Sequence, residues 1–271
     1  EDFSLTIDKA NYFAFKVDDI EEAHSHVNFQ GLASDRAAYR LGDQFDQDVL
    51  GYLTGFKQSA IHGTPNAVNS TVNGSVAVST AGTDELLSSM KIDAADFAGS
   101  GGDALALQPR TGGATDSTPA AGDTFPLTVI ARMSRLLDQQ NVDSQGRWLV
   151  VDPVFMELLK DEDSRLFNAD FGGSGLQNGQ VGTNIHGFRV YTSNNLPSVG
   201  TGPSFTGTNS STNYGMIVAG HDSAVATAEQ INKTETYRDP DSFADIVRGM
   251  HLYGRKILRP EALVNAKYHL A

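Results

Sequence analysis

The stretch GRWLVVDPVFMELLKD, residues 146–161, joins a short apolar run to a helical one. From Arg147, the run RWLVV has the continuous apolar character of a strand buried on both faces. Asp152 suits a helix N-cap because its carboxylate accepts hydrogen bonds from free backbone N–H groups, and Pro153 loses no hydrogen bond at the first helical position. The stretch therefore predicts a strand, a tight turn and a helix. The capping role accounts for Asp152, whose alternative is a catalytic carboxylate at a strand end.

Helices and strands are mixed on both sides of this stretch. Upstream, a helix is predicted with Asp123 or Thr124 as N-cap, Pro126 in its first turn, and an apolar stripe formed by Leu127, Ile130, Ala131, Ser134 and Leu137. Downstream, strands are predicted within residues 186–197, within residues 214–231 and, after a short helical start, within residues 239–270. Because no regular strand–helix alternation is present, an α+β fold is favoured over a doubly wound sheet.

The front of the chain predicts a β-hairpin followed by a long helix. Apolar residues alternate over Phe3–Ile7 and again over Phe13–Val17, on either side of the polar sequence DKAN. A hairpin this small is marginal by itself and needs another surface to lie against. From Ala37 to Phe56, apolar residues recur every three or four positions, which predicts one helix of about six turns.

Residues 62–124 are rich in Gly, Ser, Thr and Ala and poor in large apolar groups. Two short pieces, SVAVS at 75–79 and ALALQ at 104–108, have strand character among long loops. The segment is therefore predicted to be loop-rich.

Composition excludes several classes of protein. The 20 Lys and Arg against 33 Asp and Glu give a net charge of −13, which disfavours an extended nucleic-acid surface. With no Cys, disulfides and thiolate metal sites are excluded. No apolar run reaches the roughly 20 residues that span a bilayer, so a soluble globular protein is predicted.

The motifs that carry enzyme chemistry are weak. The Gly-rich loop 171–182 leads into a strand, whereas a phosphate loop opens a helix. His24 and His26 are two positions apart, which places them on different helix faces, away from any shared metal. His221 and Asp222 could be combined with one of the Ser residues into a catalytic triad, but no recognisable sequence motif surrounds them. No catalytic residue, cofactor or metal is predicted.

The order of these elements resembles the major capsid protein of tailed bacteriophages, with the fold called HK ninety-seven-like. Residues 5–23 running into 34–53 are similar to the E-loop hairpin and the spine helix of that family. Residues 132–161 resemble its axial-domain helix, strand and Pro turn. The segments HGFRVYTSNNLP, 186–197, and GRKILRPEALVNA, 254–266, look like two of its strands. The resemblance covers nearly the whole chain and is weakest over the loop-rich segment.

The resemblance implies four parts. Residues 1–19 would form the E-loop hairpin, and the N-terminal arm that precedes it in the family is expected to be missing from this sequence. Residues 20–124 would form a peripheral domain with the spine helix and a loop-rich insertion, and residues 125–230 an axial domain. Residues 231–271 would be closing strands that return to the peripheral domain.

The E-loop is expected to lie across a neighbouring subunit, which would supply the apolar contacts that a small hairpin lacks. The residues expected at this contact are Phe3, Leu5, Ile7, Lys9, Tyr12, Phe13, Phe15 and Lys16. Some relatives cross-link a Lys to an Asn with a Glu as base. Either Lys of the hairpin is a candidate for that role, although no partner is identified in the sequence.

The expected function is therefore structural and not enzymatic: a subunit that builds hexamers and pentamers of an icosahedral shell. Its expected partners are other copies of itself, a scaffolding protein, a portal and a decoration protein. It would enclose DNA without sequence-specific binding, in the virion, after assembly in the host cytoplasm. Two alternatives stay open: an encapsulin-type compartment, which cargo would reveal, and a hydrolase using a scattered Ser/His/Asp set. The loop-rich segment favours the virus, because shell loops vary without harm to the lattice.

Overall fold

The computed structural model describes residues 4–18, 29–54, 86–101, 104–107, 123–160, 184–199, 202–203 and 214–270. The chain divides into two compact units. Unit 1 combines Glu1–Val49 with Val225–Lys256, and unit 2 combines Leu50–Ala224 with Ile257–Ala271. Both contain helices and strands, so the predicted α+β class is confirmed.

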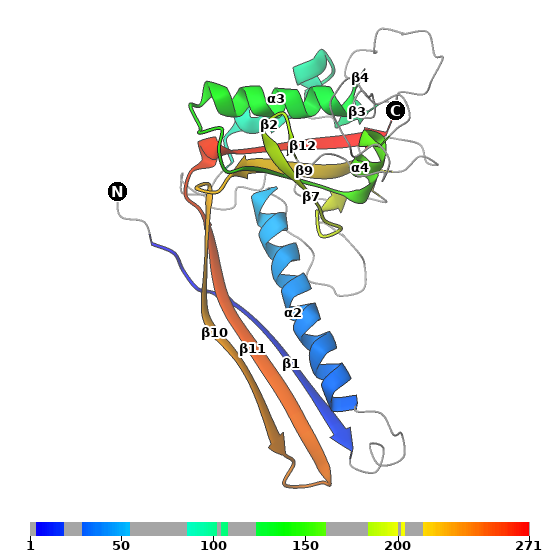
Figure 1. Cartoon of the computed structure of the whole chain (residues 1–271), viewed down its shortest axis with the longest axis vertical. Coiled ribbons are helices and arrows are strands. Elements are labelled where there is room, and N and C mark those ends of the chain that lie inside the picture. Colours follow the sequence, from blue (N-terminus) through cyan, green and yellow to red (C-terminus); the bar gives the residue numbers. More distant parts are fainter. Residues whose placement is uncertain are drawn as a thin grey trace. The chain divides into compact units, whose positions relative to one another are not determined.

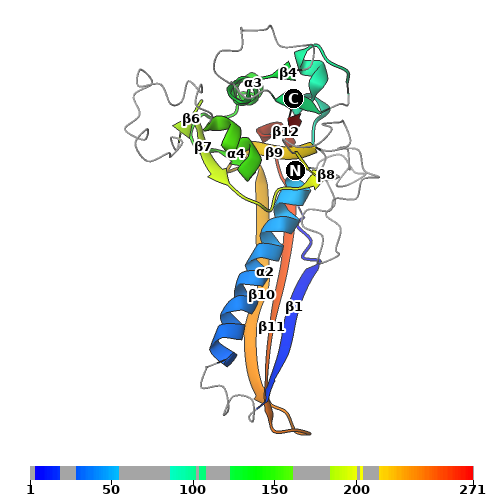
Figure 2. The ribbon, with the colours of Figure 1, turned by 90° about the vertical axis from the view of Figure 1, so that its right-hand side faces the viewer.

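Unit 1 is a helix on a three-stranded sheet with the order β1-β11-β10. Its elements are β1 (Lys9–Asp18), β10 (Val225–Arg238), β11 (Ala244–Ile257) and all but the last turn of α2 (Phe29–Leu53). Strand β1 is antiparallel to β11, in a register that runs from Lys9 opposite Tyr253 to Asp18 opposite Ala244. Figures 1 and 2 both show α2 running along this sheet.

The predicted hairpin at the front of the chain is wrong. Residues 4–18 are one extended segment, and three residues of the supposed DKAN turn lie inside β1. Odd positions are half-buried and even positions exposed without interruption from Leu5 to Val17. All the alternating apolar residues are odd-numbered, on both sides of the DKAN sequence. One uninterrupted strand therefore places all of them on the same face. The long hairpin is instead β10 and β11, joined by residues 239–243.

Helix α2 confirms the predicted long helix with shifted ends, because it begins at Phe29 and ends at Leu53. The ring of Phe45 packs edge-on against Tyr253, with 4.8 Å between ring centroids, and against His251, at 5.5 Å. These contacts place the predicted apolar stripe of the helix on the sheet.

Asp48 of α2 also faces the sheet. Its Oδ2 accepts a hydrogen bond from the Tyr253 hydroxyl at 3.1 Å and pairs with Arg255. Burial, followed by the negative charge of Asp48, raises the pKa of Tyr253 to about 12, so this phenol remains a donor across the neutral range. A polar contact therefore joins helix to sheet beside the aromatic cluster.

The close approach of β1 to β11 gives the first testable prediction. A Cβ built on Gly249 would lie 2.4 Å from Cε1 of Phe13, so Gly249→Ala must displace that ring. We expect a loss of about 1–3 kcal/mol in the free energy of unfolding, measured by calorimetry. Gly42→Ala is the matched control, because nothing lies within 4 Å of that helical position and Ala is expected to stabilise the helix by about 0.5–1 kcal/mol. Equal effects of the two substitutions would contradict the packing of β1.

Unit 2 is built on a nine-stranded mixed sheet whose main path is β4-β3-β12-β9-β5-β7-β6, with β2 beside β12 and β8 beside β9. Its strands are β2 (Lys91–Ile92), β3 (Leu105–Leu107), β4 (Asp123–Thr124), β5 (Arg147–Val151), β6 (Asn184–Ile185), β7 (Phe188–Thr192), β8 (Ser198–Val199), β9 (Tyr214–His221) and β12 (Leu263–Leu270). Its helices are α3 (Pro126–Gln139) and α4 (Pro153–Leu159), with 3-10 turns at Ser88–Met90, Ala94–Phe97 and Pro260–Ala262.

Helix α3 lies over part of this sheet and packs against β12 and α4 (Figure 1). Its fully buried residues are Pro126, Val129, Ile130, Met133 and Leu137. The predicted stripe was therefore right at Ile130 and Leu137 and one position off elsewhere. The predicted cap was wrong, because Phe125 occupies the N-cap without a side-chain hydrogen bond and Asp123 and Thr124 form β4.

The stretch from Arg147 to Leu159 folds as its sequence predicts. Strand β5 lies between β9 and β7 in the sheet, and Asp152 caps α4 by accepting a hydrogen bond from Phe155 N at 2.9 Å. The Tyr268 hydroxyl of β12 donates to the same carboxylate oxygen. Burial raises the pKa of Asp152, although both hydrogen bonds lower it. Asp152 thus joins a strand to a helix and ties both to β12.

The predicted domain boundaries differ from the units. Residues 86–107 and 123–124, predicted in the peripheral domain, add β2, β3 and β4 to the sheet of unit 2. Strand β12, predicted to return to the peripheral domain, lies in unit 2 between β3 and β9. The reason is pairing across long sequence separations, such as Tyr268 opposite Leu105, which local patterns do not encode.

Several predictions fall outside the described residues. They concern Phe3, Phe56, the strand at 75–79, the Gly-rich loop 171–182, and the pair His24 and His26. The predicted strand at 104–108 is confirmed in part by β3.

Candidate assembly surfaces

The even-numbered residues of β1 and of the middle of β11 form one face of the unit 1 sheet, which is exposed in part and partly apolar. Tyr12 and Met250 lie directly opposite each other across the two strands and are 80% and 41% exposed. Beside them, Ala10 lies opposite Leu252. The odd-numbered residues of β11 include Tyr253, which packs against α2, so the two faces of the sheet differ. We call this surface the outward face.

Arg248 belongs to the same face and is held by neighbours from β10. Its Nε and Nη2 donate to Oε2 of Glu235 at 3.1 and 2.8 Å, and its guanidinium lies over the Tyr237 ring, 5.0 Å from the centroid. Glu235 also pairs with Lys233. The hydrogen bonds from Lys233 and then Arg248 lower the pKa of Glu235 to about 2. This network holds Arg248 in place and neutralises much of its charge.

The turn between β10 and β11 is organised by Asp239. Its carboxylate accepts hydrogen bonds from Lys16 Nζ at 2.6 Å, from Ser242 Oγ at 2.7 Å and from Asp241 N at 3.1 Å. Phe243, in the same turn, is 79% exposed. The short helical start predicted here is wrong, because the Asp side chain bonds the backbone two residues on and forms a turn.

Acid is expected to loosen this turn. The hydrogen bond from Lys16 and then that from Ser242 lower the pKa of Asp239 to about 2, below its ordinary value of 3.8. A lowered folded-state pKa contributes stability that is present above the ordinary value and lost as the pH falls toward 2. Amide exchange at residues 241–244 should therefore be protected at pH 6 and lose protection between about pH 4 and 2. Asp239→Asn should exchange faster at pH 6 and show no such transition. An unchanged profile would contradict the role of the carboxylate.

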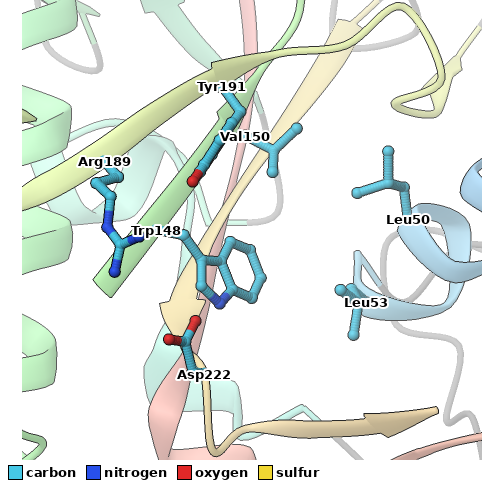
Figure 3. Close-up of a pocket in the computed structure, with 7 residues that line it drawn as sticks. All are labelled: Leu50, Leu53, Trp148, Val150, Arg189, Tyr191 and Asp222. Atoms are coloured by element: carbon cyan, nitrogen blue, oxygen red, sulfur yellow. The ribbon is translucent and has the colours of Figure 1, made fainter. Parts of the chain in front are cut away.

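A pocket of about 360 Å³ lies within unit 2 (Figure 3). Trp148 and Val150 of β5 stand beside Arg189 and Tyr191 of β7, their partners in the parallel register. The lining is completed by the last turn of α2 and the turn after β9, through Leu50, Leu53 and Asp222. Figure 3 shows the Trp148 ring between the two Leu side chains and Arg189, with Asp222 below it. The walls are largely apolar with one cation and one carboxylate, and the lining holds no paired nucleophile and base.

Most of the residues predicted at the subunit contact are packed or paired within their own chain, and Tyr12 is the strongly exposed one. Phe13 and Phe15 lie on the half-buried side of β1, where Phe13 rests on Gly249. Lys16 is paired with Asp239, and Lys9 lies 3.4 Å from Asp8. Leu5 and Ile7 are half-buried, and Phe3 lies outside the described residues. Tyr12 is the most exposed of the large hydrophobic side chains of the described residues.

Sequence reasoning missed Met250, Tyr237 and Phe243, which are 41%, 42% and 79% exposed. The sequence around Met250 did indicate an apolar outer face, because both even-numbered and odd-numbered residues of β11 are apolar there. A strand with one solvated face would have alternated. Only the register with β1 shows that Met250 and Tyr12 share one surface.

The remaining chemical candidates have structural explanations. His221 Nδ1 lies 2.8 Å from Ser223 Oγ and accepts from Ser223 N at 3.1 Å, so this pair forms a local turn two residues long. No cluster of three or more metal-binding side chains occurs within the described parts of the chain. In the same residues, no helix combines the length and apolarity needed to cross a membrane.

Comparison with models of known protein families identifies the family of the chain. A family model described as phage capsid protein matches residues 2–266. The chain belongs to the phage capsid protein family. This capsid protein is therefore a structural component of the virion shell, which is assembled from copies of the same protein, and its role is not enzymatic. The predictions of family, function and a non-enzymatic role are confirmed, and the hydrolase alternative is not supported.

Solved phage capsids share the fold of this capsid protein. A structure of Mycobacterium phage Che8 is 26% identical, with 96% of this chain and 71% of that chain covered and a TM-score of 0.61. The capsid of cyanophage P-SCSP1u is 17% identical over 98% and 74% of the chains, with a TM-score of 0.64. The mature capsid of bacteriophage PhiM1 is 19% identical over 97% and 72%, with a TM-score of 0.58.

These matches confirm the HK ninety-seven-like fold, and the encapsulin alternative is not favoured. The comparison with curated proteins gives no match.

Proposed function

We propose that this capsid protein is the major shell subunit of a tailed phage and tiles hexamers and pentamers into an icosahedral container for double-stranded DNA. The observation that carries the proposal is the family match over residues 2–266. The surface of unit 1 supports it, because exposed large apolar side chains need cover that the described residues do not provide.

The charge of the chain suits a container. A net charge of −13 repels DNA and keeps the shell from adhering to the packaged polymer. Several cations of the described sheet in unit 1 are paired with carboxylates, as in the bonds from Arg248 and Lys16. The protein would therefore enclose DNA without sequence-specific binding.

Finer features of the family are part of the same proposal. Unit 1 would correspond to the peripheral domain and unit 2 to the axial domain, with boundaries at Val49 and Leu50 and near Lys256. Assembly would take place in the host cytoplasm with a scaffolding protein and a portal, and a decoration protein could bind outside. Among the residues first expected at the subunit contact, Tyr12 has the exposure that this role requires.

Sedimentation velocity of the purified chain tests the proposal. Large closed particles are expected above a threshold concentration, with empty shells in negative-stain micrographs of the fast fraction. Addition of a candidate scaffolding protein should lower the threshold. A chain that sediments as a folded monomer at every concentration, with and without scaffold, would refute the proposed function.

A further inference from the structure

The carboxyl group of Asp152 joins three elements of unit 2. Asp152 follows the last residue of β5 and caps α4, where its Oδ1 accepts a hydrogen bond from Phe155 N at 2.9 Å. The Tyr268 hydroxyl of β12 donates to the same oxygen. The cap of α4 and the contact with β12 therefore both depend on one oxygen atom of one side chain.

This carboxyl receives no positive charge from the described residues. Both bonds from neighbouring residues reach Oδ1, and Asp152 forms no ion pair in the described parts of the chain. The two residues that bond to it are buried: Phe155 is 0% and Tyr268 1% exposed, and their rings meet edge-on with 5.4 Å between centroids. Because Oδ1 serves as the acceptor, Oδ2 is the oxygen that can carry a proton.

The charged or titratable side chains of the surrounding elements do not compensate. Tyr268 is the titratable side chain that acts on the Asp152 carboxyl, and it does so through its hydrogen bond. The side chains considered on β5, at α4 and on β12 are Arg147, Glu157, Lys160, Lys267, Tyr268 and His269. The charge of Asp152 is therefore supported by hydrogen bonds alone.

Burial without a cation favours the protonated form of a carboxyl group. Burial accordingly raises the pKa of Asp152 above its ordinary value of 3.8, and the opposing hydrogen bonds from Tyr268 and then Phe155 N offset only part of this effect. The protonated group keeps both bonds, because its carbonyl oxygen still accepts them. Asp239 differs, because its bonds from Lys16 and Ser242 lower its pKa to about 2.

The sign of the pH effect follows from this direction. A folded-state pKa above the ordinary value contributes stability that is fully present below pH 3.8 and is lost as the pH rises through the folded-state pKa.

We propose that Asp152 is a proton-binding switch in unit 2: with a proton on Oδ2 its carboxyl group holds β5, α4 and β12 together most firmly, and release of that proton at higher pH weakens this junction. The inference goes beyond the proposed function and concerns the folded subunit, whether or not it assembles.

Nuclear magnetic resonance of the unassembled subunit with isotope-labelled Asp tests the protonation step. Asp152→Asn removes the Asp152 carboxyl signal and so identifies it. The titration midpoint of this signal is expected above 3.8, and Tyr268→Phe should move it higher, because the hydroxyl favours the charged form. A midpoint at or below 3.8, or a downward shift in Tyr268→Phe, would overturn the proposal.

Urea unfolding followed by the fluorescence of Trp148, the only Trp of the chain, measures the effect on stability. Asn at position 152 still accepts both bonds and is neutral at every pH. Between about pH 4 and 7, the unfolding equilibrium constant of the original chain, relative to that of Asp152→Asn, should increase by at least about threefold.

Asp239→Asn is the control for this measurement. A pKa of about 2 keeps the Asp239 carboxylate charged over the same range, so its relative unfolding constant should change by less than about twofold. If the effect of Asp152→Asn is as independent of pH as that of the control, or reverses its direction, the switch is refuted.

Discussion

Arg147→Ala is expected to lower the free energy of unfolding of unit 2 by about 3 kcal/mol. The side chain is 3% exposed and donates to the Val142 carbonyl at 2.6 Å, to the Asp143 carbonyl at 2.8 Å and to Asp138 Oδ1 at 2.7 Å. Ala removes these donors together, so two backbone carbonyls lose their partner and a cavity opens beside β5. The guanidinium therefore holds the loop between α3 and β5 in place.

Urea unfolding followed by tryptophan fluorescence measures this loss. Trp148 is the only Trp of the chain and adjoins the substituted residue, so its signal reports unit 2. Asp138→Asn is the control, because its side chain is 62% exposed and its pairing is screened by water, so a change below about 1 kcal/mol is expected. Similar losses in the two variants would show that the ion pair, and not the bonds to the backbone, stabilises the loop.

Tyr253→Ala is expected to lower the free energy of unfolding of unit 1 by about 3–5 kcal/mol. The residue is 2% exposed, and its ring contacts Phe45 on α2 and stacks on His251 at 5.0 Å between centroids. The described residues of unit 1 form one helix and three strands, so the loss of this ring removes a large part of the contact between these layers.

Tyr253→Phe separates the ring from its hydroxyl. The hydroxyl donates to Asp48 at 3.1 Å and accepts from Asn11 Nδ2 at 3.4 Å, so its removal should cost about 1 kcal/mol. Calorimetry of the unassembled subunit measures both variants. If Phe is as damaging as Ala, the polar contact with Asp48 and not the aromatic packing holds the helix to the sheet.

Local signals in the sequence were reliable. Asp152 and Pro153 predicted the start of α4 because a cap and a fixed φ angle act within one turn of the chain. The apolar run of RWLVV predicted an interior strand, and β5 has neighbours on both sides. The N-cap of α3 was predicted wrongly. Asp123 and Thr124 both suit a cap by sequence, but they form β4, which pairs with β3.

Pairings between distant segments were not predictable from local patterns. Residues 9–18 were expected in a hairpin that reaches a neighbour, yet they complete the sheet of their own chain beside β11, more than 200 positions away. Their alternation was real, and the error lay in interpreting the sequence DKAN, residues 8–11, as a turn. These residues therefore form no separate hairpin that could point to a shell, and the family is shown by the match over residues 2–266.

The assembly surface was only partly visible in the sequence. Tyr12 was expected at a subunit contact, but its neighbours on the outward face come from β10 and β11 at the other end of the chain. Their common surface depends on the register that sets Tyr12 opposite Met250.

Cryo-electron microscopy of particles assembled from the purified chain tests the central claim most directly. We expect closed shells in which residues 9–18 of each subunit pair with β11 of the same chain, in the register of Tyr12 with Met250. Folded subunits that form no closed particle, or shells in which residues 9–18 make a separate hairpin on a neighbour, would contradict the account.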